Sequence, residues 1–365
     1  MSAPVRSPIS EIASQNSISL AEYHGAMIPE WYSDPVSECQ AVRAAAGIFD
    51  FSFRAKFSAR GSDRVRFIQG MVSNDVKSLT PGRGVYATLL DVRGHILADL
   101  DIYCQQDQFL IDTDADLIDK VLQALNHYNI GGRVPLERLP LSAISVQGPK
   151  AGSVIQEVFE GSLPGPEEFS HILADFDGRN AIIVRSSNTG EEGYQVWVPE
   201  ERALSLWETL LDRGKSAGLL PCGSKALEIL RIEVGVPEYG SELAEDTLPL
   251  EAGLTNALSF TKGCYIGQEI VERARSRGHV NWKLVGLFVN AKEAPEPGGK
   301  ILREGKEIGE VTSTCISPTL GRTLAMGYIR KEASDPGTKV ILASGSEAEV
   351  TTMPFYRCGP ADAAG

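Results

Sequence analysis

The sequence predicts an α+β protein with two related α+β units followed by a small β-barrel. Two observations support this fold class. Residues 57–69 read FSARGSDRVRFIQ and residues 144–156 read ISVQGPKAGSVIQ, so a strand, a glycine turn and a helix are expected twice, 87 residues apart. After about Gly278 the pattern changes to short alternating runs between Pro, Gly and Asn turns, which is typical of a small all-β barrel or sandwich.

The first repeated pair has a glycine at each turn, Gly61 and Gly148. A serine follows the first glycine and a proline follows the second. Ser62 suits a helix N-cap and Pro149 suits a first helical turn. Different residues are therefore expected to start the two helices.

A second pair of elements has a similar offset. Residues 109–112 form an apolar strand pattern that leads into an amphipathic helix over 115–128. About 87 residues later, residues 194–199 lead into a helix over 201–213. Chance similarity between common strand–helix pairs is the alternative interpretation, but two pairs with one offset favour a true repeat.

The barrel pattern fixes the expected domain limits. The alternating runs are 284–289, 300–302, 307–313, 323–328, 339–342 and 347–352. The expected domains are 1–140 and 141–280, each α+β, and 281–365, the barrel. These limits allow the chain to cross back between the first two domains, including at the loop 262–269. The residues from Gly359 are expected to form a frayed tail.

Composition excludes several classes of protein. A chain of 365 residues is expected to form two or three domains, and none of its apolar runs has the roughly 20 residues of a membrane span. With no secretory signal pattern, a cytoplasmic location is expected. A net charge of −13 argues against a nucleic-acid partner. The six scattered cysteines are expected to be reduced thiols, with neither a disulfide framework nor a metal site.

Two carboxylates lie on one face of a predicted strand. In residues 96–103, ILADLDIY, Asp99 and Asp101 share a face with Leu97 and Tyr103. The residue pattern alone leaves two interpretations open: the solvated face of a strand, or a pair of functional carboxylates.

The segment 262–269, KGCYIGQE, is the clearest candidate site. Its two glycines predict a tight loop with exposed backbone, and a helix is expected to start after Gly267. Lys262, the thiol of Cys264 and the N–H groups of a helix N-terminus would meet there, which suits an anion and lowers the pKa of a thiol. The alternative is a turn with an unreactive cysteine.

This segment, with the basic run that follows it, resembles the signature of the YgfZ family. The run contains Arg273, Arg275, Arg277, Gly278 and His279. The YgfZ family comprises folate-binding proteins of the glycine-cleavage T-protein superfamily that are implicated in assembling or maintaining iron–sulfur enzymes. The run 125–135, LNHYNIGGRVP, is more loosely similar to the same family.

Other stretches resemble the T-protein itself, an aminomethyltransferase. They are GIFDFS at 47–52, NTGEEGY at 188–194, LRIEVG at 230–235, GEVTS at 309–313 and SPTL at 317–320. Together the resemblances cover about residues 20–355 in collinear order. They imply two ferredoxin-like or Greek-key α+β domains and a C-terminal barrel, arranged as a ring around a hole that holds tetrahydrofolate or a one-carbon derivative.

The resemblance also implies site residues. Tyr86 and Asp99 have the thirteen-residue spacing of a T-protein pair whose Asp contacts the folate and serves the transfer chemistry. Gln195 stands where the T-protein has a Glu that grips the pterin, and Arg231 matches a folate-site Arg, although a surface Arg on an amphipathic helix is the alternative.

Three further residues of the loop complete the candidate site. Lys262 and Tyr265 are candidate folate contacts, and Cys264 is a candidate redox-active thiol. Core packing explains the two tyrosines, Tyr86 and Tyr265, about as well as stacking on the folate. The Asn-rich segment of the T-protein is Asp112-Thr113-Asp114-Ala115-Asp116 here, which argues against full aminomethyltransferase activity.

Three hypotheses about function follow. The first is a tetrahydrofolate-binding YgfZ-like protein that supports iron–sulfur client proteins. The second is an aminomethyltransferase that moves a one-carbon unit from a lipoyl carrier protein to tetrahydrofolate. The third is a folate-sensing adaptor without turnover. The Cys264 loop favours the first, the Tyr86–Asp99 spacing favours the second, and Gln195 favours the first or third.

Overall fold

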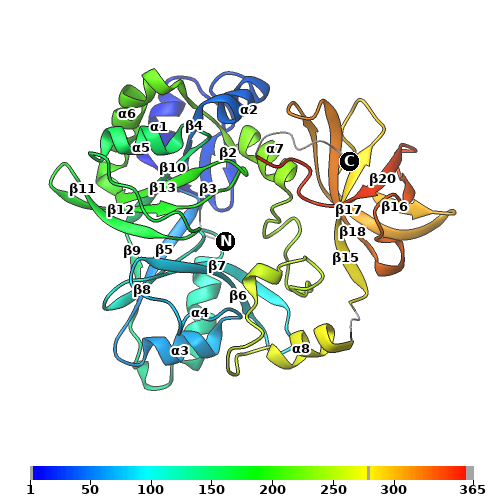
Figure 1. The fold of residues 1–365 in the computed structure, drawn as a ribbon, viewed down its shortest axis with the longest axis horizontal. Helices are drawn as coiled ribbons and strands as arrows, with labels where there is room; N and C mark the ends of the chain where they lie inside the picture. Colours follow the sequence, from blue (N-terminus) through cyan, green and yellow to red (C-terminus); the bar gives the residue numbers. More distant parts are fainter. Residues whose placement is uncertain (1–2, 278–279, 359–365) are drawn as a thin grey trace.

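The computed structural model describes residues 3–277 and 280–358, which form a five-stranded antiparallel sheet, a six-stranded mixed sheet, a small three-stranded sheet and a closed β-barrel (Figure 1). The chain begins with β1 (Val5–Arg6), α1 (Pro8–Gln15), the hairpin β2 (Leu20–Tyr23) and β3 (Ala26–Pro29), and α2 (Pro35–Ala44). Gly278 and His279 of the basic run, and the expected tail from Gly359, lie outside the described residues.

The first sheet has the strand order β6-β7-β8-β5-β9. Its strands are β5 (Arg54–Arg60), β6 (Arg83–Leu90), β7 (Ile96–Cys104), β8 (Gln108–Asp114) and β9 (Leu136–Leu139). The helices α3 (Arg64–Met71) and α4 (Ile118–Tyr128) cover its outer face with a core that includes Ile68, Val121 and Leu125. Each such buried side chain stabilises the fold by roughly 1.5–3 kcal/mol.

The second sheet has the order β11-β12-β13-β10-β4-β14. Its strands are β4 (Ala46–Asp50), β10 (Leu141–Gln147), β11 (His171–Phe176), β12 (Arg179–Arg185), β13 (Gly193–Pro199) and β14 (Leu219–Pro221). Residues of α1, α5 (Ala151–Val158) and α6 (Ala203–Gly214) pack on it. A separate cluster, including Tyr103, Leu110 and Trp197, joins the two sheets.

The predicted repeat is present in the structure. The strands β5 and β10 begin at residues 54 and 141, and the helices α3 and α5 begin at residues 64 and 151, so both pairs keep the 87-residue offset. The strand order β6-β7-β8-β5 of the first sheet also corresponds to β11-β12-β13-β10 of the second. The two units therefore share one topology around different cores.

The predicted helix starts were wrong at both copies. Asp63 and Lys150 occupy the N-cap positions of α3 and α5, and neither side chain caps its helix. In the second copy the Ala151 N–H instead donates to the Gly148 carbonyl at 2.9 Å. Gly148 has a φ of 134°, and a Cβ there would lie 2.6 Å from the Ala45 carbonyl oxygen. The turn therefore includes Pro149 and Lys150, and the helix begins at Ala151, two residues later than a start at Pro149 would give.

The chain crosses between the two units three times: between β4 and β5, between β9 and β10, and after the last strand of the second sheet. The strand β4 precedes the whole first sheet in sequence, yet it pairs antiparallel with β10 and parallel with β14 of the second sheet. After α7 (Ser224–Val234) the chain returns, and side chains from 243–271 pack against β6 and β7. This return segment contains the loop 262–269 and leads into α8 (Gln268–Arg277).

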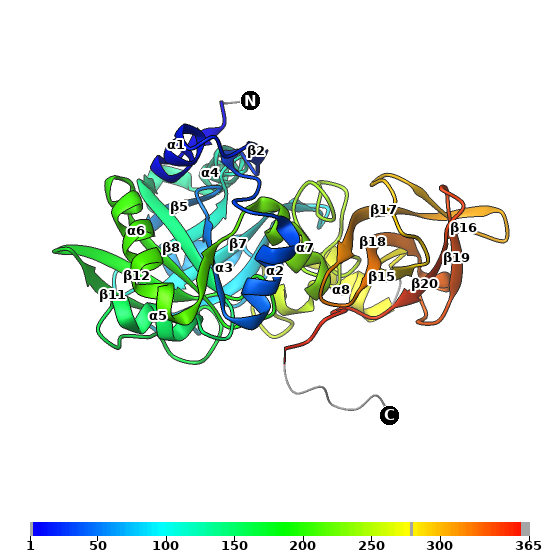
Figure 2. The ribbon, with the colours of Figure 1, turned by 90° about the horizontal axis from the view of Figure 1, so that it is seen from above.

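The barrel closes in the order β15-β18-β17-β16-β19-β20. Its strands are β15 (Trp282–Val289), β16 (Lys300–Arg303), β17 (Lys306–Ser317), β18 (Arg322–Arg330), β19 (Lys339–Leu342) and β20 (Glu347–Thr351). This confirms the expected C-terminal barrel. The helix α7 packs against it through Ile232, which contacts a cluster containing Leu324 and Met326. Figure 2 shows the barrel to one side of the two sheets, with α7 between them.

No helix in the described part of the chain is long and apolar enough to cross a membrane.

Candidate functional site

A cavity of about 720 Å³ lies where the two sheets, α7 and the barrel meet. Tyr86, Asp99 and Asp101 line it from the first sheet, and Gln195 lines it from the second. Arg231 of α7 and residues of the barrel complete the wall. Small-molecule sites commonly measure about 300–1,000 Å³ and lie between domains. The cavity therefore has the size and position of a ligand site.

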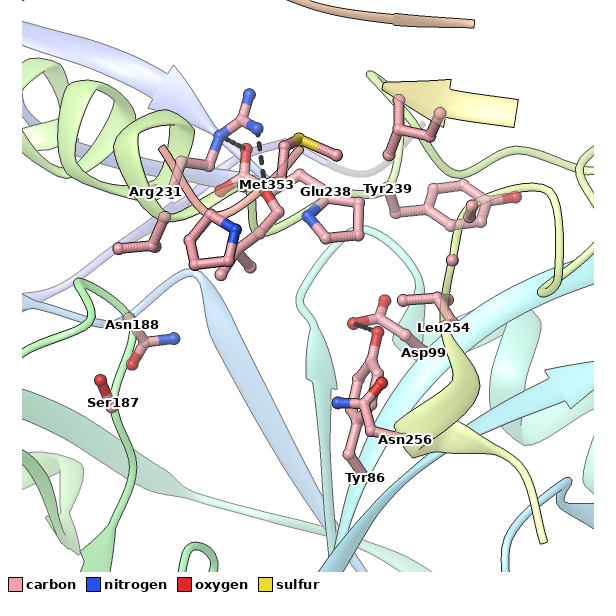
Figure 3. A pocket seen from close by; sticks show the side chains of 18 of the residues that line it. Tyr86, Asp99, Ser187, Asn188, Arg231, Glu238, Tyr239, Leu254, Asn256 and Met353 are labelled. Carbon is pink, nitrogen blue, oxygen red and sulfur yellow. Dashed lines mark hydrogen bonds and ion pairs between the residues drawn. The ribbon is translucent and has the colours of Figure 1, made fainter. Parts of the chain in front are cut away.

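Tyr86 and Asp99 lie together on one wall. They come from the adjacent strands β6 and β7, and the Tyr86 hydroxyl donates to Asp99 Oδ2 at 3.3 Å (Figure 3). Asp99 Oδ1 is buried and accepts no hydrogen bond from any residue that the structure describes. Burial raises the pKa of Asp99 to about 6; the charge of Asp114 adds to the rise, and Arg54 opposes it. The Asp99 carboxylate at the cavity thus has one oxygen that no described residue satisfies.

Arg231 lies on the opposite side of the cavity beside Glu238 (Figure 3). Its side chain is 3% exposed, and its guanidinium meets three carboxylates: Glu228 at 2.5 Å, Glu238 at 2.9 Å and Glu242 at 3.2 Å. It also donates to Ser313 of the barrel at 2.8 Å. The structure therefore places Arg231 at the cavity with its charge already neutralised by the protein.

Gln195 contributes an amide to the cavity wall from β13. Its Nε2 donates to Ser186 Oγ at 3.2 Å, and its Oε1 accepts from the Trp197 indole N–H at 3.1 Å. The residue is 2% exposed. Both ends of the amide are engaged, so the side chain is held in one orientation.

Two of the three Asp residues at the position of the Asn-rich segment, Asp112 and Asp114, are neutralised from the neighbouring strand. The Arg54 guanidinium pairs with Asp112 at 3.2 Å and with Asp114 at 2.8 Å. His24 bridges Asp114 and Glu238, each at 3.3 Å. Burial alone would lower the pKa of His24, but its hydrogen bond to Glu238 and the charge of Asp114 raise the pKa to about 9.

The loop residues Lys262, Cys264 and Tyr265 do not line the cavity. The Lys262 ammonium donates to the carbonyls of Gln69, Val72 and Asn74 at 2.7, 2.5 and 2.8 Å. Tyr265 is 7% exposed and packs in the cluster that covers β6 and β7, whereas Cys264 is exposed. The structure brings the loop against the strands that carry Tyr86 and Asp99, but not into the cavity.

The contacts of Lys262 predict a large effect on stability. In Lys262→Met three carbonyls lose a charged donor, and we expect the free energy of unfolding to fall by about 2–4 kcal/mol in urea titrations. The exposed Lys150→Met is the matched control and should change it by less than about 0.5 kcal/mol. Equal effects of the two substitutions would show that the hydrogen bonds of Lys262 contribute nothing to the free energy of unfolding.

Cys264 is expected to alkylate fastest of the six cysteines. Only Cys264 and Cys358 are exposed among the described residues. A hydrogen bond with Glu191, together with burial, raises the pKa of the Cys358 thiol. Burial raises the pKa of the remaining four thiols, Cys39, Cys104, Cys222 and Cys315. Timed iodoacetamide labelling near neutral pH with peptide mass spectrometry measures the order, and prior reaction of any other cysteine would contradict the prediction.

Sequence reasoning missed several charged residues of the cavity wall, among them His24, Arg54 and Glu238. A usable signal existed for Arg54. Arg54 and Lys56 alternate on a strand whose neighbour carries Asp112 and Asp114 at the same spacing, which is the pattern of a cross-strand ion-pair ladder. Glu238 gave no comparable signal, because it lies in an irregular segment after α7.

The fold and the cavity define a protein with two large sheets, a C-terminal barrel and a ligand-sized cavity between them, and the sequence comparisons assign its family. Residues 10–262 match the GCVT N-terminal domain, and residues 283–357 match the glycine cleavage T-protein C-terminal barrel domain. The chain therefore belongs to the glycine cleavage T-protein family, which confirms the superfamily that its motifs indicated.

Three proteins that are similar to this chain over nearly its whole length are named aminomethyltransferase. The chain is 33% identical to the aminomethyltransferase of Bacillus subtilis (strain 168), covering 96% of this chain and 99% of that protein. It is also 33% identical to the aminomethyltransferase of Geobacillus sp. (strain WCH70), covering 96% and 98%. The crystal structure of the glycine cleavage system aminomethyltransferase T from Bartonella henselae superposes with a TM-score of 0.89 at 26% identity, covering 96% and 98%. None of these similarities points to the YgfZ branch, so they favour the aminomethyltransferase hypothesis.

Proposed function

We propose that the protein binds tetrahydrofolate, or a one-carbon derivative, in the cavity and transfers a one-carbon unit as an aminomethyltransferase. The observation that carries this proposal is Asp99, whose Oδ1 is buried without a partner among the described residues while it lines the cavity. A buried acceptor of this kind fits the N–H groups of a reduced pterin. The full-length similarity to aminomethyltransferases supports the same reaction class.

Each wall of the cavity has a role in this proposal. The reduced folate supplies the amine nitrogens that take up the one-carbon unit. Asp99, held by Tyr86, accepts a hydrogen bond from the folate and stabilises the positive charge that develops at its nitrogens. Gln195 faces the same space from the second sheet. We further propose that the two sheets and the barrel, with ferredoxin-like or Greek-key α+β units, form a ring that encloses the folate.

The proposed reaction balances without an oxidant. The donor is an aminomethyl group on a thiol of a lipoyl carrier protein. Its carbon–sulfur and carbon–nitrogen bonds break, and the carbon forms two bonds to folate nitrogens. The two protons that leave those nitrogens pass to the thiolate and to the departing ammonia. In this proposal Asp99, which lines the cavity, holds a proton during the exchange.

The experiment for this proposal measures binding and transfer separately. Calorimetry with tetrahydrofolate should show saturable binding, and an aminomethyl-loaded lipoyl carrier should then yield methylene-tetrahydrofolate and ammonia. Absence of folate binding would overturn the whole proposal. Binding without transfer would leave the adaptor hypothesis in its place.

Gln195 provides a sharper test of the binding geometry. Gln195→Glu keeps an acceptor for the Trp197 N–H and adds a charge toward the cavity. If β13 faces the pterin, the stronger charge-assisted hydrogen bond should tighten tetrahydrofolate binding by about tenfold in calorimetry. Gln195→Met, which removes the amide, is the paired control and should weaken binding. Unchanged affinity in both variants would remove Gln195 from the folate site.

The exposed thiol favours a second candidate function, a YgfZ-like role toward iron–sulfur client proteins. Cys264 lies in the KGCYIGQE loop outside the cavity, where it could meet a protein client without displacing folate. Cys264→Ala should then keep folate affinity but lose support of iron–sulfur enzymes in a cell that lacks its own such protein. Full complementation by the mutant would leave aminomethyl transfer as the better hypothesis.

A further inference from the structure

The cavity face of the first sheet carries four carboxylates in adjacent positions. Asp99 and Asp101 alternate along β7, and Asp112 and Asp114 alternate along β8. The register places Asp101 directly opposite Asp112. Like charges in directly opposed positions destabilise a sheet, and burial increases the cost. The fold therefore needs a positively charged group that offsets the repulsion among these carboxylates.

Arg54 supplies this positive charge. It lies on β5 directly opposite Asp114, with a side chain that is 12% exposed. Its three nitrogens each address a different carboxylate: Nε meets Asp112 at 3.2 Å, Nη1 meets Asp114 at 2.8 Å, and Nη2 meets Asp101 at 3.4 Å. One guanidinium thus spans three strands beside Asp99.

The neighbouring lysine plays a different part. Lys56 lies opposite Asp112 in the register, and its ammonium donates to the Arg54 carbonyl at 2.8 Å. It remains 3.9 Å from the Asp112 carboxylate, and burial lowers its pKa to about 8. Of the two basic residues on β5, Arg54 is therefore the one whose charge lies closer to the cavity carboxylates.

We propose that Arg54 is a positioning residue that keeps Asp99 ionised beside the bound folate by holding the three surrounding carboxylates in a fixed, partly neutralised arrangement. The purpose of this arrangement rests on the proposed one-carbon transfer. The effect of Arg54 on the charge of Asp99 does not depend on that reaction, and it can be measured without a substrate.

The groups that act on Asp99 have opposite signs. They come from β6, β7, β8, β5 and the β2–β3 turn, and they are Tyr86, Asp101, Asp114, Arg54 and His24. After burial, the charge of Asp114 is the largest influence that raises the pKa of Asp99, and Arg54 and His24 lower it. Removing Arg54 and removing Asp114 should therefore move the titration of Asp99 in opposite directions.

The test is a carboxyl titration of the ligand-free protein. The full chain is labelled with ¹³C at the aspartate carboxyl, and the Asp99 signal is assigned with Asp99→Asn. We expect the wild-type midpoint at about pH 6. Arg54→Gln should raise it by about one pH unit or more, because an opposite charge is lost. Asp114→Asn should lower it by about one pH unit, because a like charge is lost.

A surface substitution of the same chemistry is the control. Asp119→Asn on α4 removes an aspartate whose side chain is 79% exposed, and it should leave the Asp99 midpoint unchanged. If Arg54→Gln does not fold, as near-ultraviolet circular dichroism would show, Arg54→Lys takes its place: it keeps one positive charge but lacks the guanidinium fork that meets three carboxylates, so the Asp99 midpoint should still rise. An unmoved Asp99 midpoint in the folded variants would overturn the proposal.

The same variants separate this inference from the proposed function. If the wild type transfers one-carbon units, the acid limb of its pH–rate profile should follow the Asp99 midpoint in each variant. If the wild type shows no transfer but the carboxyl midpoints move as stated, the proposed function fails and the role of Arg54 stands. If transfer occurs but the midpoints do not move, the role of Arg54 fails alone.

Discussion

Asp99→Asn is expected to reduce one-carbon transfer by about 10²–10⁴-fold. The asparagine keeps the shape and one acceptor oxygen, but it loses the charge that would stabilise positive nitrogen and hold a proton. Tetrahydrofolate affinity should fall less, by about 1–3 kcal/mol, because binding loses one charge-assisted hydrogen bond. Steady-state transfer assays and calorimetry measure the two effects independently.

The pH dependence of the wild type gives a second view of the same residue. Since the pKa of Asp99 is raised to about 6, the active carboxylate is populated above that pH and lost as the pH falls through it. The wild-type rate should therefore decline below about pH 6, and the residual rate of Asp99→Asn should lack this limb. Tyr86→Phe, which removes the hydroxyl donor at 3.3 Å, is the conservative companion and should lower the rate much less. A full rate in Asp99→Asn would exclude Asp99 from the chemistry.

Arg231→Met is expected to reduce the free energy of unfolding by about 3–5 kcal/mol, because it leaves Glu242 buried without its cationic partner. The Glu242 side chain is fully buried and also accepts from Thr312 and Ser313 of the barrel. The ion pair therefore joins α7 to the barrel, so its loss should weaken the whole fold. Urea unfolding followed by circular dichroism measures the change.

The control uses another partner of the same arginine. Glu228 is 33% exposed, so Glu228→Gln should cost less than about 1 kcal/mol. Arg231→Met together with Glu242→Gln should recover part of the loss, because the unpaired charge is removed as well. If Arg231→Met is as stable as the wild type, the buried contacts of Arg231 do not support the fold.

The sequence predicted the elements of the fold better than their partners. Hydrophobic alternation located the strands of the barrel, and the repeat located β5, α3, β10 and α5, because both signals are local. The pairing of β4 with the second sheet depends on contacts nearly 100 residues away along the chain. The N-caps were misjudged because Ser62 and Pro149 favour helix starts in general, whereas the glycine turns decide where these helices begin.

The candidate site was predictable where spacing carried the information. Tyr86 and Asp99 were identified because their spacing resembles that of a T-protein pair, and the structure brings their side chains into contact at the cavity. The helix that was expected to start after Gly267 is present as α8. Lys262 was predicted to contact folate. Its true neighbours are backbone carbonyls on another element. Backbone acceptors have no residue type, so no sequence pattern marks them.

The three hydrogen bonds of Lys262 also have a consequence for the order of events during protein synthesis. Its three acceptor carbonyls lie 188 to 193 residues earlier in the chain. At about 5–20 residues per second, a ribosome takes roughly 10–40 s to reach the lysine after making them. During that time the carbonyls of Gln69, Val72 and Asn74 lack the Lys262 donor. The apolar side chains of β6 and β7 that the return segment later covers are also exposed. The first sheet is therefore finished only after the second sheet has been made, although all five of its strands are synthesised before β10.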